Sequence, residues 1–118
     1  GGSSMGGIIS FYMALTYPEI FGYVLPFSSS HWLYTEGHIQ NFIDAKVTGD
    51  ISRFPRLYFW VGGDETKITQ YPSMIKTALL VKGYNESDIY TTSTAGAGHN
   101  EPAWARAFPA AYRWLVKF

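Results

Sequence analysis

The chain has 118 residues, of which 47% are hydrophobic, 18% aromatic and only 15% charged. Nine basic and nine acidic residues give a formal net charge of zero, so no charge excess favours binding to nucleic acid or to a membrane surface. The absence of cysteine excludes disulfides, thiol nucleophiles and cysteine-bound zinc. No apolar run approaches the roughly 20 residues that a membrane-spanning helix needs.

Apolar segments in the first half of the chain predict one strand and two helices. Residues 8–15 (IISFYMAL) are apolar on nearly every side, which predicts a buried helix that ends before Pro18. The continuous apolar run 22–27 predicts a buried parallel strand, which Pro26 brings to its end. A short helix is expected over residues 36–45.

Two more strands are expected in the second half. Residues 57–61 (LYFWV) give the clearest strand, and they run directly into two glycines. Residues 73–82 have helical spacing, with Gly83 as the left-handed residue that terminates the helix. The β-branched residues in 89–93 predict the third strand.

A final helix is expected after the third strand, and it completes the alternation of strands and helices. Its apolar face contains Trp104, Phe108, Ala111, Tyr112 and Leu115. Pro109 should kink this helix or begin a second one. Strands that alternate with helices predict an α/β fold with a parallel sheet, here as one domain over residues 1–118.

No signal-peptide pattern opens the chain, which favours a cytoplasmic location.

The strongest chemical signal is the G-x-S-x-G pattern of residues 2–6 (GSSMG), centred on Ser4. In such a strand-to-helix turn, glycines two residues before and after the serine avoid clashes, and the serine hydroxyl is exposed. The helix that begins near Met5 points backbone N–H groups at a developing oxyanion. The competing interpretation is a flexible glycine-serine linker, because no strand is expected before the turn. The apolar helix that follows immediately argues against a linker.

A serine nucleophile needs a base, and the chain offers three histidines. His99 follows the last expected strand, where the base stands in the chain order serine, acid, histidine. Its alternative role is to cap the helix that begins at residues 100–102. His31 follows three serines at a strand end and could line the same crevice, although a plain surface role is the simpler interpretation. His38 has no assigned role, and nothing in the spacing favours a metal site of His31, His38 and Asp44 over chance.

Two carboxylates follow the strand over residues 57–61. Asp64 and Glu65 lie just past its carboxyl end, where catalytic groups gather in α/β sheets. One of the two could fix the tautomer of a catalytic histidine. At least one of them must have the simpler role of a solvent-exposed turn residue. No phosphate-binding lysine loop and no dinucleotide fingerprint is present, so no cofactor is expected.

Four segments together resemble a known family. The segments GGSSMGG, YPEIFGYVLPFSSSHW, LYFWVGGDE and GHNEPAW are similar, in order and spacing, to the carboxyl-terminal half of the "Putative esterase" family of α/β-hydrolases. This family includes esterase D (S-formylglutathione hydrolase), siderophore esterases, feruloyl and acetyl-xylan esterases, and mycolyltransferases. The resemblance covers essentially all 118 residues and implies a partial α/β-hydrolase domain that starts at the nucleophile turn, with the amino-terminal half absent.

The resemblance implies a serine carboxylesterase that works through an acyl-enzyme. Ser4 would be the nucleophile, His99 the base, and the backbone N–H of Met5 an oxyanion donor. The acid of the family falls on Glu65, and the neighbouring Asp64 is the alternative. The side chains expected to contact the substrate are His31, Trp32 and Trp104.

Two other functions are compatible with the same fold. An acyltransferase would use the same triad, and a non-catalytic module would hold a sugar or aryl ligand with Trp32, Tyr34 and Trp104. The expected partner is a small-molecule ester. The edge of the strand over residues 22–27, beside the absent strand, is expected to pair with the missing amino-terminal half or with a second copy of the chain.

Overall fold

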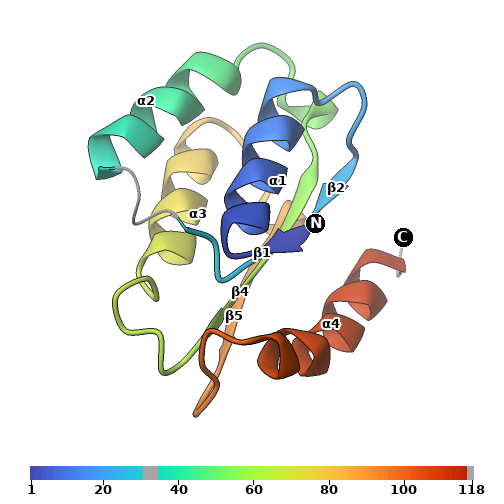
Figure 1. The fold of residues 1–118 in the computed structure, drawn as a ribbon. Coiled ribbons are helices and arrows are strands. Elements are labelled where there is room, and N and C mark those ends of the chain that lie inside the picture. Colours follow the sequence, from blue (N-terminus) through green and yellow to red (C-terminus); the bar gives the residue numbers. More distant parts are fainter. Residues whose placement is uncertain (31–34, 117–118) are drawn as a thin grey trace.

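The chain folds as a parallel sheet flanked by helices, which confirms the predicted α/β class (Figure 1). The computed structural model describes residues 1–30 and 35–116. The strands are β1 (Gly2–Ser3), β2 (Tyr23–Val24), β3 (Pro26–Phe27), β4 (Arg56–Gly62) and β5 (Ile89–Thr94). The helices are α1 (Met5–Thr16), α2 (Glu36–Lys46), α3 (Tyr71–Val81) and α4 (Glu101–Val116), with 3₁₀ turns η2 (Ile51–Arg53) and η3 (Glu86–Asp88).

Strand β4 lies at the centre of the sheet. It pairs in parallel with β2 and β3 on one side and with β5 on the other. β2 and β3 keep a single register against β4, with Tyr23 opposite Arg56 and Phe27 opposite Trp60. They are therefore two parts of the one predicted strand over residues 22–27. Pro26 has no N–H to donate, so the hydrogen-bond ladder is interrupted there.

Strand β1 corrects the expectation that no strand precedes the turn at Ser4. Its two residues pair in parallel with Pro26 and Phe27, and the N–H of Ser4 continues the ladder to the carbonyl of Phe27 at 2.9 Å. A strand this short has no alternation that a sequence pattern could show. The prediction that the strand over residues 22–27 has an unpaired edge is wrong for residues 26–27, because β1 pairs with them. Pairing of the sheet edge with another chain stays a prediction.

The two faces of β4 are buried in two separate cores. Leu57 and Phe59 point to one face, where they pack with buried residues of α1, α2 and α3. Tyr58 and Trp60 point to the other face and pack against α4. Figure 1 shows α4 on one side of the sheet and the other three helices on the opposite side. Burial on both faces explains why the sequence of this strand is a continuous apolar run rather than an alternating one.

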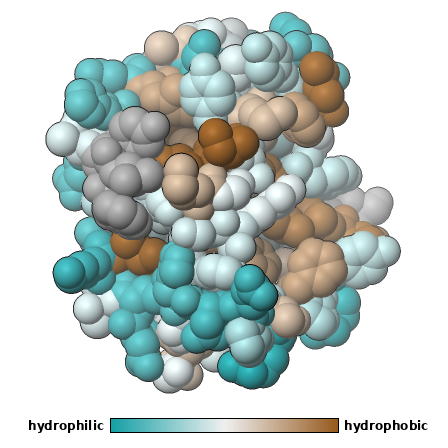
Figure 2. All heavy atoms as spheres, viewed as in Figure 1, coloured by the Kyte–Doolittle hydropathy of each residue, from teal (hydrophilic) through white to brown (hydrophobic). Residues whose placement is uncertain are grey.

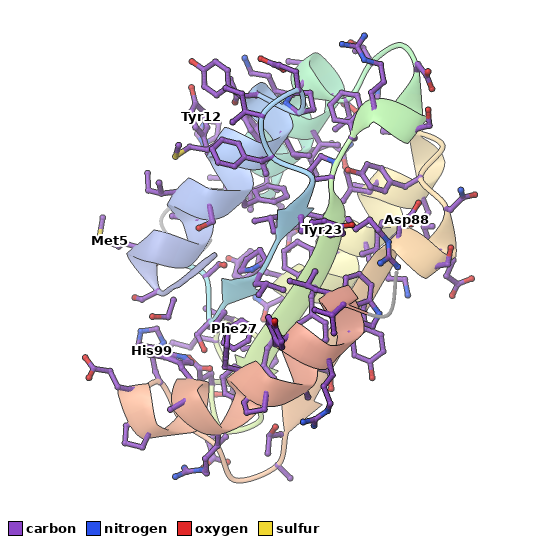
Figure 3. All side chains as sticks on the ribbon, turned by 90° about the vertical axis from the view of Figure 1, so that its right-hand side faces the viewer. Met5, Tyr12, Tyr23, Phe27, Asp88 and His99 are labelled. Atoms are coloured by element: carbon purple, nitrogen blue, oxygen red, sulfur yellow. The ribbon has the colours of Figure 1, made fainter. Side chains whose placement is uncertain are left out.

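Helix α1 is less buried than its composition predicted. Phe11 and Leu15 are buried against the sheet, but Ile9 is 53% exposed and Tyr12 is 49% exposed. Figure 3 shows Met5 and Tyr12 pointing away from the sheet, and Figure 2 shows hydrophobic side chains on the surface of the molecule. Within the described residues, this helix therefore has an uncovered apolar face.

The remaining helices follow the predictions with small shifts. The helix predicted over 36–45 is α2, the one predicted over 73–82 is α3, and Gly83 after it has the expected positive φ of 107°. α4 continues through Pro109, so this proline does not begin a second helix. None of the helices in the described ranges is long and apolar enough to cross a membrane.

Candidate active site

Three turns that are distant in sequence meet at the carboxyl ends of the strands. Ser4 follows β1, Glu65 follows β4 and His99 follows β5. The Nε2 atom of His99 lies 3.0 Å from Oγ of Ser4, and its Nδ1 atom lies 2.6 Å from Oε1 of Glu65. Figure 3 shows His99 on the side of the molecule where α1 begins at Met5. The structure therefore joins the three side chains in one hydrogen-bonded chain.

The turn at Ser4 has the strained geometry that its sequence pattern predicts. Ser4 has φ 55° and ψ −122°, in a region that residues other than glycine rarely adopt. It precedes α1 without capping it through its side chain, and its hydroxyl lies 3.0 Å from Nε2 of His99 and 3.3 Å from Oγ of Ser30. Its carbonyl accepts hydrogen bonds from the N–H groups of Gly7 and Ser30, so the turn is held from both the helix and the segment after β3.

The two glycines of the G-x-S-x-G pattern are not equivalent. A Cβ atom on Gly2 would lie 2.6 Å from the carbonyl oxygen of Gly6, which no real side chain tolerates. A Cβ atom on Gly6 itself would meet nothing within 4 Å. The tight position after the serine is Gly7 instead, where a Cβ atom would clash with the Ser29 hydroxyl. The expectation that Gly6 avoids a clash is therefore wrong.

This difference predicts opposite effects of two alanine substitutions. Gly6→Ala should raise the free energy of unfolding by up to about 1 kcal/mol, because alanine is the better helix former and the site is open. Gly2→Ala should lower it by roughly 1–3 kcal/mol, because the backbone must move to admit the methyl group. Thermal unfolding of both variants measures the difference. Equal destabilisation by the two changes would contradict the assignment.

Glu65 is held by more than its contact with His99. Its Oε2 atom accepts hydrogen bonds from the N–H of Gly62 and from the hydroxyl of Ser28, both at 2.6 Å. Its side chain is only 6% exposed. Asp64 is exposed, and its backbone N–H donates to the carbonyl of Ala97. The geometry thus separates the two adjacent carboxylates, with Glu65 turned to His99 and Asp64 turned to solvent.

The glycine pair after β4 makes this arrangement sterically feasible. A Cβ atom on Gly62 would clash with the carbonyl of Ala97 and would lie 2.9 Å from Oε2 of Glu65. A Cβ atom on Gly63 would lie 2.9 Å from the carbonyl of Thr94. The two glycines let the loop that carries His99 approach the end of β4.

The hydrogen-bond partners of His99 determine which of its two ring nitrogens carries the proton. A carboxylate accepts, so the short contact to Oε1 of Glu65 assigns the imidazole proton to Nδ1 of His99. Nε2 is then an acceptor for the hydroxyl of Ser4. Met5, the first residue of α1, has no acceptor for its backbone N–H inside the helix, and this end of the helix has a positive dipole. The arrangement can remove the proton of Ser4 and stabilise negative charge beside it.

Trp104 lies on the first turns of α4, half-buried beside the three side chains. Its indole N–H donates to Oγ of Ser28 at 2.9 Å. Its ring meets the His99 ring edge-on, with centroids 5.0 Å apart and planes at 85°. No sequence pattern pointed to Ser28, which is one of three consecutive serines. The other expected substrate contacts, His31 and Trp32, and also Tyr34, lie outside the described residues.

The remaining candidates lie away from this site. His38 is exposed on the first turn of α2 and borders an apolar groove of about 620 Å³ between α1 and α2. The other residues that line the groove are Ile8, Ile9, Phe11, Tyr12, Ile39 and Phe42. Within residues 1–30 and 35–116, no three His, Asp or Glu side chains cluster as a metal site would require.

Comparison with known proteins gives the family of the chain. The uncharacterized protein YbbA of Bacillus subtilis (strain 168) is 26% identical over 118 residues, which cover 97% of this chain and 47% of that protein. The chain thus spans about half the length of this curated relative. No solved structure matches the chain. A sequence profile of the family described as "Putative esterase" matches residues 1–115. The chain belongs to this esterase family.

Proposed function

We propose that the protein is a serine carboxylesterase in which Ser4 is the nucleophile, His99 the general base and Glu65 the acid that orients it. The observation that carries the proposal is the pair of contacts made by one imidazole ring, 3.0 Å to Oγ of Ser4 and 2.6 Å to Oε1 of Glu65. The strained backbone of Ser4 supports it, because strain of this kind persists where function requires it.

The first half-reaction forms the acyl-enzyme. Oγ of Ser4 attacks the ester carbonyl carbon as its proton moves to Nε2 of His99, and the carbonyl oxygen becomes an oxyanion. The backbone N–H of Met5 is the donor that we assign to this oxyanion. The tetrahedral intermediate then collapses, the bond to the alkoxy oxygen breaks, and the alcohol leaves with the proton from His99.

The second half-reaction returns the enzyme to its starting state. Water gives a proton to Nε2 of His99 as its oxygen attacks the acyl carbonyl. Collapse of the second tetrahedral intermediate releases the carboxylic acid and restores the proton to Oγ of Ser4. Throughout both halves, the Glu65 carboxylate stabilises the imidazolium form of His99 without taking its proton.

Covalent labelling tests this proposal directly. A serine-directed fluorophosphonate should add a single phosphonyl group to the protein, and peptide mass spectrometry should locate it on Ser4. The protein should also hydrolyse a short aryl ester. His99→Ala should remove both properties, because Ser4 then has no base. An unlabelled protein that hydrolyses no ester would refute the proposal and favour a ligand-binding role. Added alcohols that capture the acyl group would identify acyl transfer.

A further inference from the structure

Ser28 is the fully buried link between two parts of the site. It follows β3 with a positive φ of 46° and is 0% exposed. Its N–H donates to the carbonyl of Trp60 at 2.8 Å, which fixes its backbone to β4. Its hydroxyl lies between the indole of Trp104 and Oε2 of Glu65, at 2.9 and 2.6 Å.

The direction of these two hydrogen bonds is determined by the indole. The indole N–H of Trp104 is a donor only, so the oxygen of Ser28 must accept from it. A serine hydroxyl has a single proton, and its remaining partner here is Oε2 of Glu65. That proton therefore points at the carboxylate, and the chain runs from Trp104 through Ser28 to Glu65.

This direction has a consequence for His99. Oε2 of Glu65 receives two donors, the hydroxyl of Ser28 and the N–H of Gly62, so a proton on that oxygen would face two others. Both donors therefore meet Oε2 as an acceptor, and Oε1 is left turned to His99. As the acceptor at 2.6 Å, Oε1 holds the imidazole proton on Nδ1, which leaves the lone pair of Nε2 toward Ser4.

We propose that Ser28 is a positioning residue for the reaction, and that Trp104 fixes the direction of its proton. The inference rests on the proposed function, since the side chain that they position is the proposed acid. Neither residue needs to touch the substrate in this role. Trp104 thus receives a role different from the substrate contact that the sequence suggested.

Adjacent serines provide a matched pair of variants. Ser28→Ala should lower kcat for an aryl ester by roughly 10- to 100-fold, the cost of one charge-assisted hydrogen bond, with KM almost unchanged. Ser29→Ala should leave kcat unchanged, because the buried Ser29 hydroxyl has no hydrogen-bond partner among the described residues. Ser28→Gly should repeat the loss of kcat while relaxing the positive φ, which separates the hydroxyl from backbone strain. Equal kcat values for Ser28→Ala and Ser29→Ala would overturn the proposal.

A second readout does not depend on catalysis. In the unliganded protein, the hydrogen-bonded Nδ1 proton of His99 should give a low-field ¹H NMR resonance. Ser28→Ala should shift or broaden this signal, and Ser29→Ala should leave it in place. If no ester is hydrolysed but the resonance responds in this way, the proposed function fails and the positioning network stands. A resonance that Ser28→Ala does not alter would overturn the network.

Trp104→Phe keeps an aromatic ring and removes only the indole N–H. It should lower kcat less than Ser28→Ala does, because the Ser28 hydroxyl remains and loses only its fixed direction. A rise in KM with unchanged kcat would instead place Trp104 against the substrate and overturn its part in the proposal.

Discussion

In the Ser4→Ala protein, hydrolysis of a short aryl ester is expected to fall roughly 10⁶-fold. The reason is that no other atom in the proposed mechanism can form the acyl-enzyme. The fold should persist, because the Ser4 backbone bonds to Phe27, Gly7 and Ser30 do not involve the hydroxyl. Steady-state rates and thermal unfolding on the same preparation test both statements.

Ser3→Ala is the matched control for this experiment. Ser3 is the neighbouring serine and lies in β1 opposite Phe27, one residue before the strained turn. Its removal should leave turnover within a few-fold of the unsubstituted protein. Phosphonate labelling that survives Ser4→Ala and disappears in Ser3→Ala would transfer the nucleophile to Ser3.

Glu65→Gln is expected to lower kcat by roughly 10³- to 10⁴-fold, although it changes only one atom. The N–H of Gly62 and the hydroxyl of Ser28 both donate to the Oε2 position, so the glutamine oxygen must occupy it. The amide NH₂ group then faces Nδ1 of His99 and forces the imidazole proton to Nε2. In that tautomer His99 can no longer accept the proton of Ser4. The measurement is kcat against an aryl ester, together with a thermal unfolding curve.

Asp64→Asn is the matched control, because it makes the same change from carboxylate to amide at the adjacent position. Asp64 is exposed and contacts the loop after β5 through its backbone N–H, which the substitution keeps. Its kcat should therefore change by less than a few-fold. If Asp64→Asn reduced kcat more than Glu65→Gln did, Asp64 would be the acid.

The sequence predicted the elements that carry a strong local pattern. The run over residues 57–61 is apolar because both faces of β4 are buried, and it gave the central strand within one residue at each end. The turns at Ser4 and after Gly62 were visible because close backbone approach there requires glycine. Parallel strands bring their carboxyl ends to one edge, so the meeting of these turns followed from the fold class.

Features that depend on distant neighbours could not be predicted in this way. Strand β1 is only two residues long and exists because Pro26 and Phe27 pair with it. The exposed face of α1 has the same apolar composition as its buried face, so the pattern could not tell them apart. Ser28 meets Trp104 across 76 positions of the chain, and nothing distinguishes it locally from the two serines that follow.

The distance in sequence between Ser4 and His99 has a consequence for how the protein folds. Ninety-five positions separate the two atoms that meet at 3.0 Å, and His99 lies in the loop that leads into α4. Contacts of such long range close late and slowly, after the local helices have formed. A partly folded chain that already contained the Ser4 turn and α1 would lack the contact with His99, the proposed base. We therefore expect the reactivity of Ser4 to rise only when the loop that carries His99 docks, and the rate of phosphonate capture during refolding would time that docking.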